Sequence, residues 1–126
     1  MARPLAPRRL LVIEDDEAIR TLVREVLLDG GFDVQEARSG NDALARIAAI
    51  EPDLILLDKL MPDGDGTAFA RDYHARKGPH APIVALSAAA DAGEWAAQIG
   101  ASAYLGKPLD IDDLLAVVKA ELAKKR

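Results

Sequence analysis

Acidic side chains occur where two short apolar runs of the sequence end. Glu14, Asp15 and Asp16 follow the first run, and Asp58 follows the third. Two carboxylates about 4 Å apart repel by about 4 kcal/mol at an effective dielectric near 20, so a fold that gathers them needs a compensating charge. Hard oxygen ligands, few in number and with room left for water and phosphate, suit Mg²⁺ better than Ca²⁺. If the two runs are neighbouring strands, their ends predict a Mg²⁺ site.

Two more polar residues end the fourth and fifth apolar runs. Ser87 closes the fourth run, and Lys107 follows the fifth, directly before Pro108. A hydroxyl donates a hydrogen bond to a phosphoryl oxygen, and an ammonium group neutralises phosphoryl charge. Each residue alone is typical of any protein surface. Together with the acids, they predict a pocket for a cation and a phosphoryl group.

The acids nearest the first helix have a simpler interpretation. Asp16 is placed as an N-cap and Glu17 lies in the first helical turn, where a negative charge stabilises a helix. We therefore leave both out of the predicted metal site, which consists of Glu14, Asp15 and Asp58.

Short apolar runs alternate with segments of helical period, as in a parallel sheet covered by helices. The predicted strands are residues 9–13, 32–37, 53–57, 82–86 and 103–105. Right-handed crossovers in a doubly wound α/β sheet of order 2-1-3-4-5 place strands one and three side by side, with ligands bound at their carboxyl ends. This flavodoxin-like arrangement brings Asp58 to the acids that follow strand one.

Five helices are predicted between and after these strands. The first ends at Gly30, the second starts at Ser39 and ends before Pro52, and the third follows Gly66 and ends at Gly78. The fourth, around residues 91–99, is weakly patterned, and the fifth starts at Asp110. The side chains predicted to face the core are Ile19, Leu22, Val23, Val26 and Leu27 in the first helix and Ile111, Leu114, Leu115, Val118 and Leu122 in the fifth.

Length and composition favour one globular domain. We expect residues 1–8 to form a flexible tail and residues 9–126 to form the domain. Acidic residues number 21 against 16 Lys and Arg, so direct nucleic-acid binding is not expected. The chain has no cysteine, and its apolar runs are too short for an export signal or a membrane span. The cytoplasm is therefore the expected location.

At these residues the chain resembles the receiver domain of bacterial two-component response regulators, in particular the single-domain chemotaxis type. The resemblance covers residues 10 to about 122 and is carried by the acid pair Glu14-Asp15, by Asp58 in Leu-Leu-Asp58-Lys-Leu-Met-Pro62, by Ala-Leu-Ser87-Ala and by Tyr104-Leu-Gly-Lys107-Pro108. It implies a Mg²⁺-dependent switch that takes a phosphoryl group from a sensor histidine kinase or phosphotransfer protein and signals to a downstream protein. Such a domain turns over no conventional substrate; it catalyses its own phosphorylation and dephosphorylation.

The resemblance also implies a role for each site residue. Asp58 would be the phosphoacceptor, a nucleophile rather than a general base. Asp58 and Asp15 would bind Mg²⁺ directly together with the backbone carbonyl of Leu60, and Glu14 would act through water. Lys107 and Ser87 would hold the phosphoryl group, and Ser87 and Tyr104 would move in the switch. For Tyr104, plain packing at the sheet edge is the alternative.

Several positions depart from the family pattern. Lys59 is expected to be an exposed charge or, alternatively, to tune access to the site. Leu60 and Ala89 lack polar side chains that could orient a water, which predicts slow self-dephosphorylation. The interval from Ser87 to Lys107 is short, which suggests an altered fourth helix. Trp95 there is interpreted as packing rather than as a partner anchor. His74 and His80 are expected at the surface, outside the site.

Three alternatives to a receiver have different requirements. A nucleotide binder of similar strand order would need a Gly- or Ser/Thr-rich loop after strand one, where Glu14-Asp15-Asp16 would repel phosphate. A phosphatase of the aspartate-nucleophile type would need its nucleophile after strand one and a second Asp two residues later. The segment Glu14-Asp15-Asp16-Glu17 does not supply that pattern convincingly. A phosphate-independent interaction module that keeps the fold is the serious alternative. Output is expected through another protein, unless the chain is part of a longer one.

Overall fold

The computed structural model describes residues 7–61, 64–88 and 90–124. Its elements in chain order are β1 (Arg9–Ile13), α1 (Glu17–Asp29), β2 (Asp33–Ala37), α2 (Gly40–Ala49), β3 (Leu54–Asp58), β4 (Leu60–Met61), β5 (Gly64–Asp65), α3 (Gly66–Ala75), β6 (Ile83–Ser87), α4 (Ala92–Gln98), β7 (Ala103–Gly106) and α5 (Ile111–Lys124). Five of the strands form one sheet in the order β2-β1-β3-β6-β7, and every neighbouring pair is parallel. The predicted doubly wound sheet of order 2-1-3-4-5 is confirmed.

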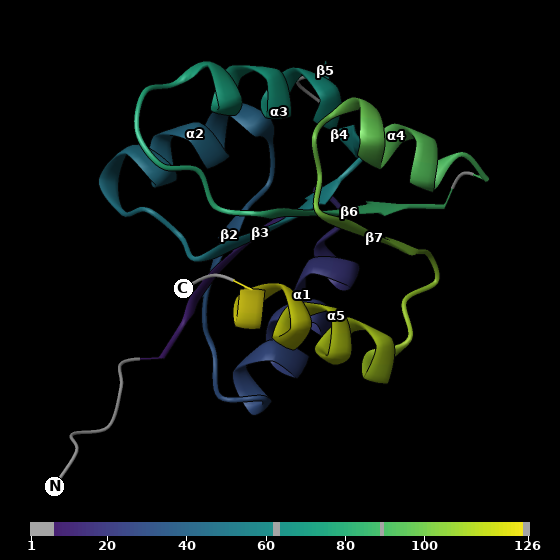
Figure 1. Cartoon of the computed structure of the whole chain (residues 1–126). Helices are drawn as coiled ribbons and strands as arrows, with labels where there is room; N and C mark the ends of the chain where they lie inside the picture. Colours follow the sequence, from purple (N-terminus) through teal and green to yellow (C-terminus); the bar gives the residue numbers. More distant parts are fainter. Residues whose placement is uncertain (1–6, 62–63, 89, 125–126) are drawn as a thin grey trace, which may run out of the picture.

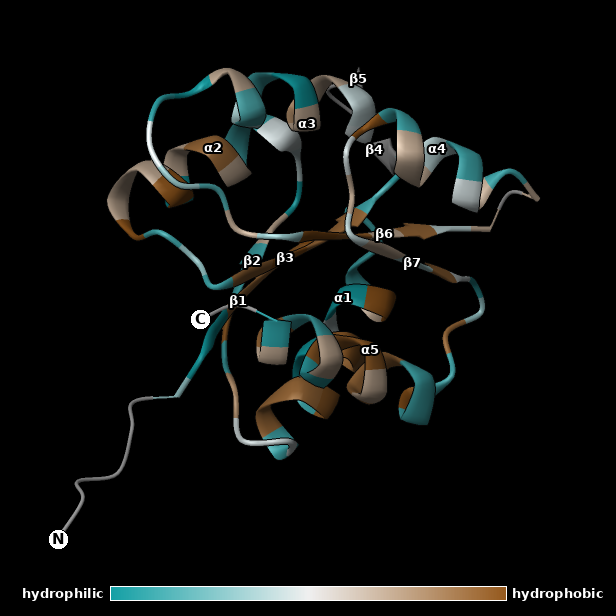
Figure 2. Ribbon diagram, viewed as in Figure 1, coloured by the Kyte–Doolittle hydropathy of each residue, from teal (hydrophilic) through white to brown (hydrophobic). Residues whose placement is uncertain are grey.

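Helices cover both faces of the sheet (Figure 1). Helices α2, α3 and α4 lie on one face, and α1 and α5 lie on the other. The hydrophobic core divides in the same way into two clusters, one that includes Phe69 and Trp95 and another that includes Leu27 and Val118. The central strands carry the hydrophobic colour of Figure 2 because side chains on both of their faces are buried. Because both faces of the central strands are covered by helices, polar side chains can collect where these strands end, at the carboxyl edge of the sheet.

Helix caps fix where the chain leaves this edge. Asp16 precedes α1, and its Oδ1 accepts a hydrogen bond from the backbone N–H of Ile19 at 3.0 Å. Ser39 caps α2 by accepting from Asp42 N at 3.1 Å, and Asp110 accepts from Asp113 N at 2.9 Å before α5. The predicted N-cap roles of Asp16 and Ser39 are therefore confirmed.

Three details differ from the sequence predictions. Leu22 and Ile111 were placed in the core but are 50% and 48% exposed. Leu22 lies on the flank of α1, about 100° around the helix from Val23, which is buried. Ile111 is the first residue of α5. The short antiparallel pair β4–β5 was not predicted, because strands of two residues are too short to show a period.

The weak fourth helix is real and short. It spans Ala92–Gln98, and Trp95 within it is 3% exposed, which confirms that this side chain packs in the core. None of the helices in the described part of the chain is long and apolar enough to cross a membrane. Residues 1–6 of the expected N-terminal tail, together with Pro62 and Ala89, fall outside the described residues.

Candidate functional site at the carboxyl edge of the sheet

Parallel pairing brings the polar residues to one edge of the sheet. Ile13 of β1 pairs with Leu57 of β3, so Glu14 and Asp58, the next residues along each strand, emerge side by side. Asp58 pairs in turn with Leu86, and Ser87 is the last residue of β6. The same strand register that buries the apolar side chains therefore gathers the polar ones.

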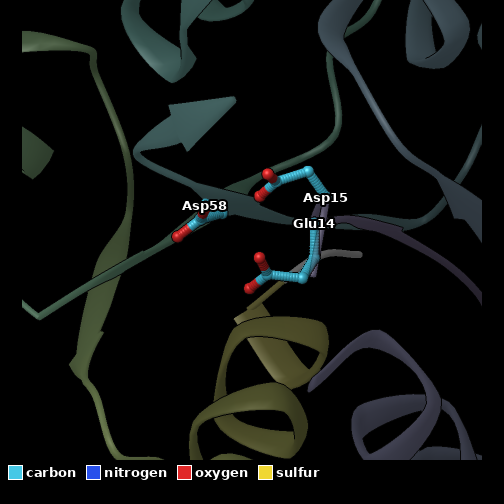
Figure 3. A group of neighbouring side chains, drawn as sticks. All are labelled: Glu14, Asp15 and Asp58. Atoms are coloured by element: carbon cyan, nitrogen blue, oxygen red, sulfur yellow. The ribbon is translucent and has the colours of Figure 1, made fainter. Parts of the chain in front are cut away.

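Three carboxylates converge at this edge (Figure 3). Glu14 and Asp15 come from the end of β1 and Asp58 from the end of β3, and their side chains turn toward a common space. One ligand oxygen from each lies within 4.8 Å of the others. Asp15 is exposed, whereas Glu14 and Asp58 are only 1% and 5% exposed. Oxygen ligands that are held together, partly buried and open on one side fit a Mg²⁺ ion that keeps several waters.

Lys107 compensates part of this negative charge. Its Nζ donates hydrogen bonds of 2.8 Å to Oε1 of Glu14 and of 2.8 Å to Oδ1 of Asp58. Burial alone would lower the pKa of Lys107, but the bonds to the two carboxylates outweigh it and raise the pKa. The ammonium group therefore stays charged beside the Asp58 oxygen.

The raised pKa of Glu14 shows that its negative charge is unfavourable at this edge. Burial raises the pKa of Glu14, and the nearby charge of Asp58 adds to the increase. The bond from Lys107 and one from the backbone N–H of Asp16, at 3.3 Å, act in the opposite direction. Glu14 and Asp58 share one lysine, and the pKa of the buried Glu14 is raised. A divalent cation would supply the positive charge that these carboxylates lack, so the site fits such an ion.

Arg20 holds the acidic segment in place, although its position in the sequence does not mark it as a site residue. Its Nη1 donates to the backbone carbonyl of Glu14 at 2.8 Å, and its Nε donates to Oε1 of Glu36 at 3.1 Å. Its side chain is only 11% exposed. The partner Glu36 sits in β2 opposite Val12, so this contact depends on strand pairing and has no local sequence signal.

Ser87 and Lys107 are linked through the backbone. Ser87 is 4% exposed, and its carbonyl accepts a hydrogen bond of 3.0 Å from the backbone N–H of Lys107. Tyr104, also predicted to take part in a switch, lies one strand further out and is 54% exposed. Its ring packs against Gly93 of α4, where an added Cβ would lie 3.1 Å from the ring. The structure thus brings Ser87 to the acidic edge and places Tyr104 against α4.

Lys59 is not the free surface charge that the sequence suggested. Its side chain is 24% exposed, and its Nζ lies 3.4 Å from Oδ1 of Asp91, the residue before α4. The ammonium group also lies 5.8 Å from the centre of the Trp95 ring. Trp95 in turn donates a hydrogen bond of 2.8 Å from Nε1 to Oγ1 of Thr67, in the first turn of α3. This set of contacts joins α4 to the strand end that carries Asp58.

Some residues named in the sequence analysis lie far from this site, and others are not described by the structure. His74 and His80 are exposed and line a pocket at the other end of the sheet. Leu60 belongs to β4, two residues after Asp58. The prediction of slow dephosphorylation depends on the Leu60 side chain and on Ala89. Neither that side chain nor Ala89 is described by the structure. It stays a prediction.

The chain is similar in sequence to known regulatory proteins. The response regulator MprA of Mycolicibacterium vanbaalenii is 38% identical over 120 residues, which cover 94% of this chain and 52% of that protein. The KDP operon transcriptional regulatory protein KdpE of Escherichia coli is 38% identical over 117 residues, covering 91% of this chain and 51% of that protein. The chain thus spans about half the length of these relatives.

Solved structures show the same fold. A putative response regulator from Chloroflexus aurantiacus superposes with a TM-score of 0.85 at 33% identity and covers 93% of this chain and 98% of that one. The chemotaxis response regulator CheY4 of Vibrio cholerae has a TM-score of 0.84 at 26% identity, with 91% and 98% covered. The response regulator receiver domain family matches residues 10–119. This chain therefore belongs to the response regulator receiver domain family.

Proposed function

We propose that this receiver domain is a phosphoacceptor switch in which Asp58 takes a phosphoryl group from a phosphohistidine. An Asp58 carboxylate oxygen forms the new O–P bond as the N–P bond of the donor histidine breaks and its imidazole leaves. Hydrolysis of the acyl phosphate by water later returns the carboxylate and inorganic phosphate. The observation that carries the proposal is the 2.8 Å contact of Lys107 Nζ with Asp58, at an edge shared with two more carboxylates.

Each side chain has a defined task in this proposal. Asp15 and Asp58 would hold Mg²⁺ together with the Leu60 backbone carbonyl, and Glu14 would contact it through water. The bound ion would neutralise charge on the transferring oxygens. Lys107, whose Nζ lies 2.8 Å from Asp58 Oδ1, would pair with a phosphoryl oxygen, and Ser87, on the adjacent strand end, would donate its hydroxyl to another.

The switch follows from the charge that phosphorylation adds. A phosphoryl group brings about −1.5 to −2 charges and three acceptor oxygens, which draw Ser87 toward it and bias an existing equilibrium between two conformations. Tyr104 would then leave its present place against Gly93 and turn inward. The donor would be a sensor histidine kinase or a phosphotransfer protein, and the output a downstream protein. The cytoplasm remains the expected location, in keeping with a chain that contains no cysteine.

Mass spectrometry of the intact protein tests the reaction. The chain is incubated with Mg²⁺ and a small phosphodonor such as acetyl phosphate, and we expect one added phosphoryl group that Asp58→Asn abolishes. Asp16→Asn is a matched control two residues from Glu14, because asparagine caps a helix as well as aspartate does. This variant should be phosphorylated like the wild type. Equal labelling of Asp58→Asn would refute the proposal, and an unlabelled wild type that still binds its partner would favour a phosphate-independent module.

A further inference from the structure

A pocket lies at the opposite edge of the sheet from Asp58. It has a volume of about 350 Å³ and lies between the carboxyl-terminal ends of α3 and α5 and the start of β6. Its lining includes His74, His80, Glu121 and Lys124. Ile83 at the start of β6 lines it, whereas Ser87 at the end of the same strand belongs to the acidic edge. Four residue steps along a strand separate the two sites by about 13 Å.

The two histidines of the chain meet in this pocket. The sequence has two histidines, and the ring centroids of His74 and His80 are 5.5 Å apart. Two imidazoles bound to one tetrahedral metal ion, with metal–nitrogen distances of about 2.0–2.1 Å, have centroids about 5.2 Å apart. The observed separation is close to this value, so both rings can bind one ion once a nitrogen of each turns toward it.

The environment of His80 leaves one nitrogen available to a metal. Nε2 of His80 lies 2.9 Å from the carbonyl oxygen of Arg76, and because a carbonyl can only accept, Nε2 carries the proton. Nδ1 of the neutral ring then keeps its lone pair. Hydrogen bonding of the remote ring nitrogen to a carbonyl is the arrangement that orients metal-binding histidines. The Tyr73 ring packs edge-on against His80, with centroids 5.0 Å apart, and restricts its orientation further.

His74 is also held in a form suited to metal binding. Partial burial of the ring lowers the pKa of His74, although the residue as a whole is exposed, and the adjacent His80 lowers it further, so the neutral ring is favoured. Its Cε1 edge faces Gly100, where an added Cβ would lie 3.4 Å from it. His74 lies in the last turn of α3, whose carbonyl end favours a cation.

Glu121 supplies an oxygen to the same pocket. Among the described residues, the buried polar side chains are Glu14, Asp58, Ser87 and Glu121, and the first three belong to the acidic edge. Glu121 is 5% exposed and forms a 2.7 Å ion pair with Lys124, whose side chain is 68% exposed. A solvent-exposed lysine can exchange for another cation at little cost. The carboxylate of Glu121 and the nitrogens of the two histidines do not all lie within 4.8 Å of one another, so the Glu121 side chain must rotate to join them.

We propose that His74 and His80 form a binding site for a divalent transition-metal ion such as Zn²⁺, with Glu121 as a third ligand and water in the open position. Imidazole ligands suit Zn²⁺, whereas Mg²⁺ takes oxygen ligands, so the two edges of the sheet select different metals. This site is independent of phosphorylation at Asp58.

The test is a Zn²⁺ titration of the chain without a histidine tag, followed by NMR of the imidazole signals and by calorimetry. The signals of both rings should shift together and saturate at one Zn²⁺ per chain. His74→Gln and His80→Gln should each weaken binding by at least about tenfold, since even a group that only orients a ligand is worth about 10–100-fold. Glu121→Gln should weaken binding less, and Lys124→Gln should strengthen it because a competing cation is removed.

Asp15→Asn is the control for zinc bound at the acidic edge, and it should leave the imidazole shifts and their saturation point unchanged. Both histidines are exposed, so the two variants should stay folded without metal, and His80→Gln should lose only a little stability with the contacts to Arg76 and Tyr73. The wild-type spectrum decides the matter without any variant. If one equivalent of Zn²⁺ shifts neither imidazole, or if both histidine variants bind as tightly as the wild type, the site does not exist.

Discussion

Lys59 and Asp91 form an ion pair that connects the end of β3, which carries Asp58, to α4. The Lys59 Nζ lies 3.4 Å from Oδ1 and 3.5 Å from Oδ2 of Asp91. Lys59 directly follows Asp58, and Asp91 directly precedes the first residue of α4. The same ammonium group lies 5.8 Å from the centre of the Trp95 ring, so Lys59 contacts both the residue before α4 and a core side chain of α4.

This relationship predicts a fluorescence signal, since Trp95 is the single tryptophan of the chain. A phosphoryl group on Asp58 should draw Lys59 away from Asp91 and from the indole, which changes Trp95 emission. Asp91→Asn should show part of that change before phosphorylation and lose less than about 1 kcal/mol of stability, because the pair is partly exposed. Asp112→Asn, at an exposed acid of α5, is the control. Identical spectra of Asp91→Asn and wild type in both states would contradict the prediction.

Gly66 is predicted to be intolerant of any side chain. A Cβ there would lie 2.6 Å from the Asp58 carbonyl oxygen and 2.9 Å from Cζ2 of Trp95. Gly66→Ala should therefore lower the free energy of unfolding by about 1–3 kcal/mol, the usual cost of overpacking. Gly106→Ala is the matched control, because nothing lies within 4 Å of its added Cβ. Urea unfolding measures both, and equal midpoints for the two variants would show that the crowding at Gly66 is relieved without cost.

The sheet order and the residues of its carboxyl edge could be predicted because both depend on local patterns. Apolar runs mark strands buried on both faces, and the residue that ends each run must lie at the edge. Asp58 and Ser87 prove to be the last residues of β3 and β6, so the prediction of where they lie needed only the strand ends and the crossover rule.

The contacts between distant segments could not be predicted in this way. Arg20 reaches the Glu14 carbonyl because β2 places Glu36 on its other side, and Lys59 is paired because Asp91, the residue before α4, lies near it. Glu36 is far in sequence from Arg20, and Asp91 is far from Lys59. Charged residues at such positions are more often free at the surface. Leu22 shows the opposite error, since an apolar residue on the flank of a helix fits the period and is still half exposed.

Lys107 is predicted to stabilise the domain mainly when no divalent ion is bound. Lys107→Met removes hydrogen bonds to Glu14 and Asp58, both buried, and should lower the free energy of unfolding by about 1–3 kcal/mol in chelator. Saturating Mg²⁺ should recover most of this loss, because a cation at the acidic edge replaces the missing charge and binds only the folded state. Lys119→Met, at an exposed position of α5, is the control. The same loss with and without Mg²⁺ would mean that the ion does not bind beside these carboxylates.

Tyr73 is predicted to make the domain sensitive to alkaline pH. Its hydroxyl accepts a hydrogen bond from Ala81 N at 2.7 Å and donates one to Oε1 of Glu51 at 2.8 Å. Burial raises the pKa of Tyr73 from 10.0 to about 12. Between these values the folded state keeps a proton that the unfolded state has lost, so the free energy of unfolding falls as pH rises through this range.

Tyr73→Phe should flatten this pH dependence and also cost about 1–3 kcal/mol at neutral pH, because the buried Ala81 N–H loses its acceptor. Tyr104→Phe is the matched control, since Tyr104 is the other tyrosine of the chain and is 54% exposed. Urea unfolding followed by circular dichroism at a series of alkaline pH values compares the slopes. Lysines also titrate in this range, so the difference between wild type and Tyr73→Phe isolates the tyrosine. If the two slopes agree, the Tyr73 hydroxyl titrates as freely in the folded state as in the unfolded one.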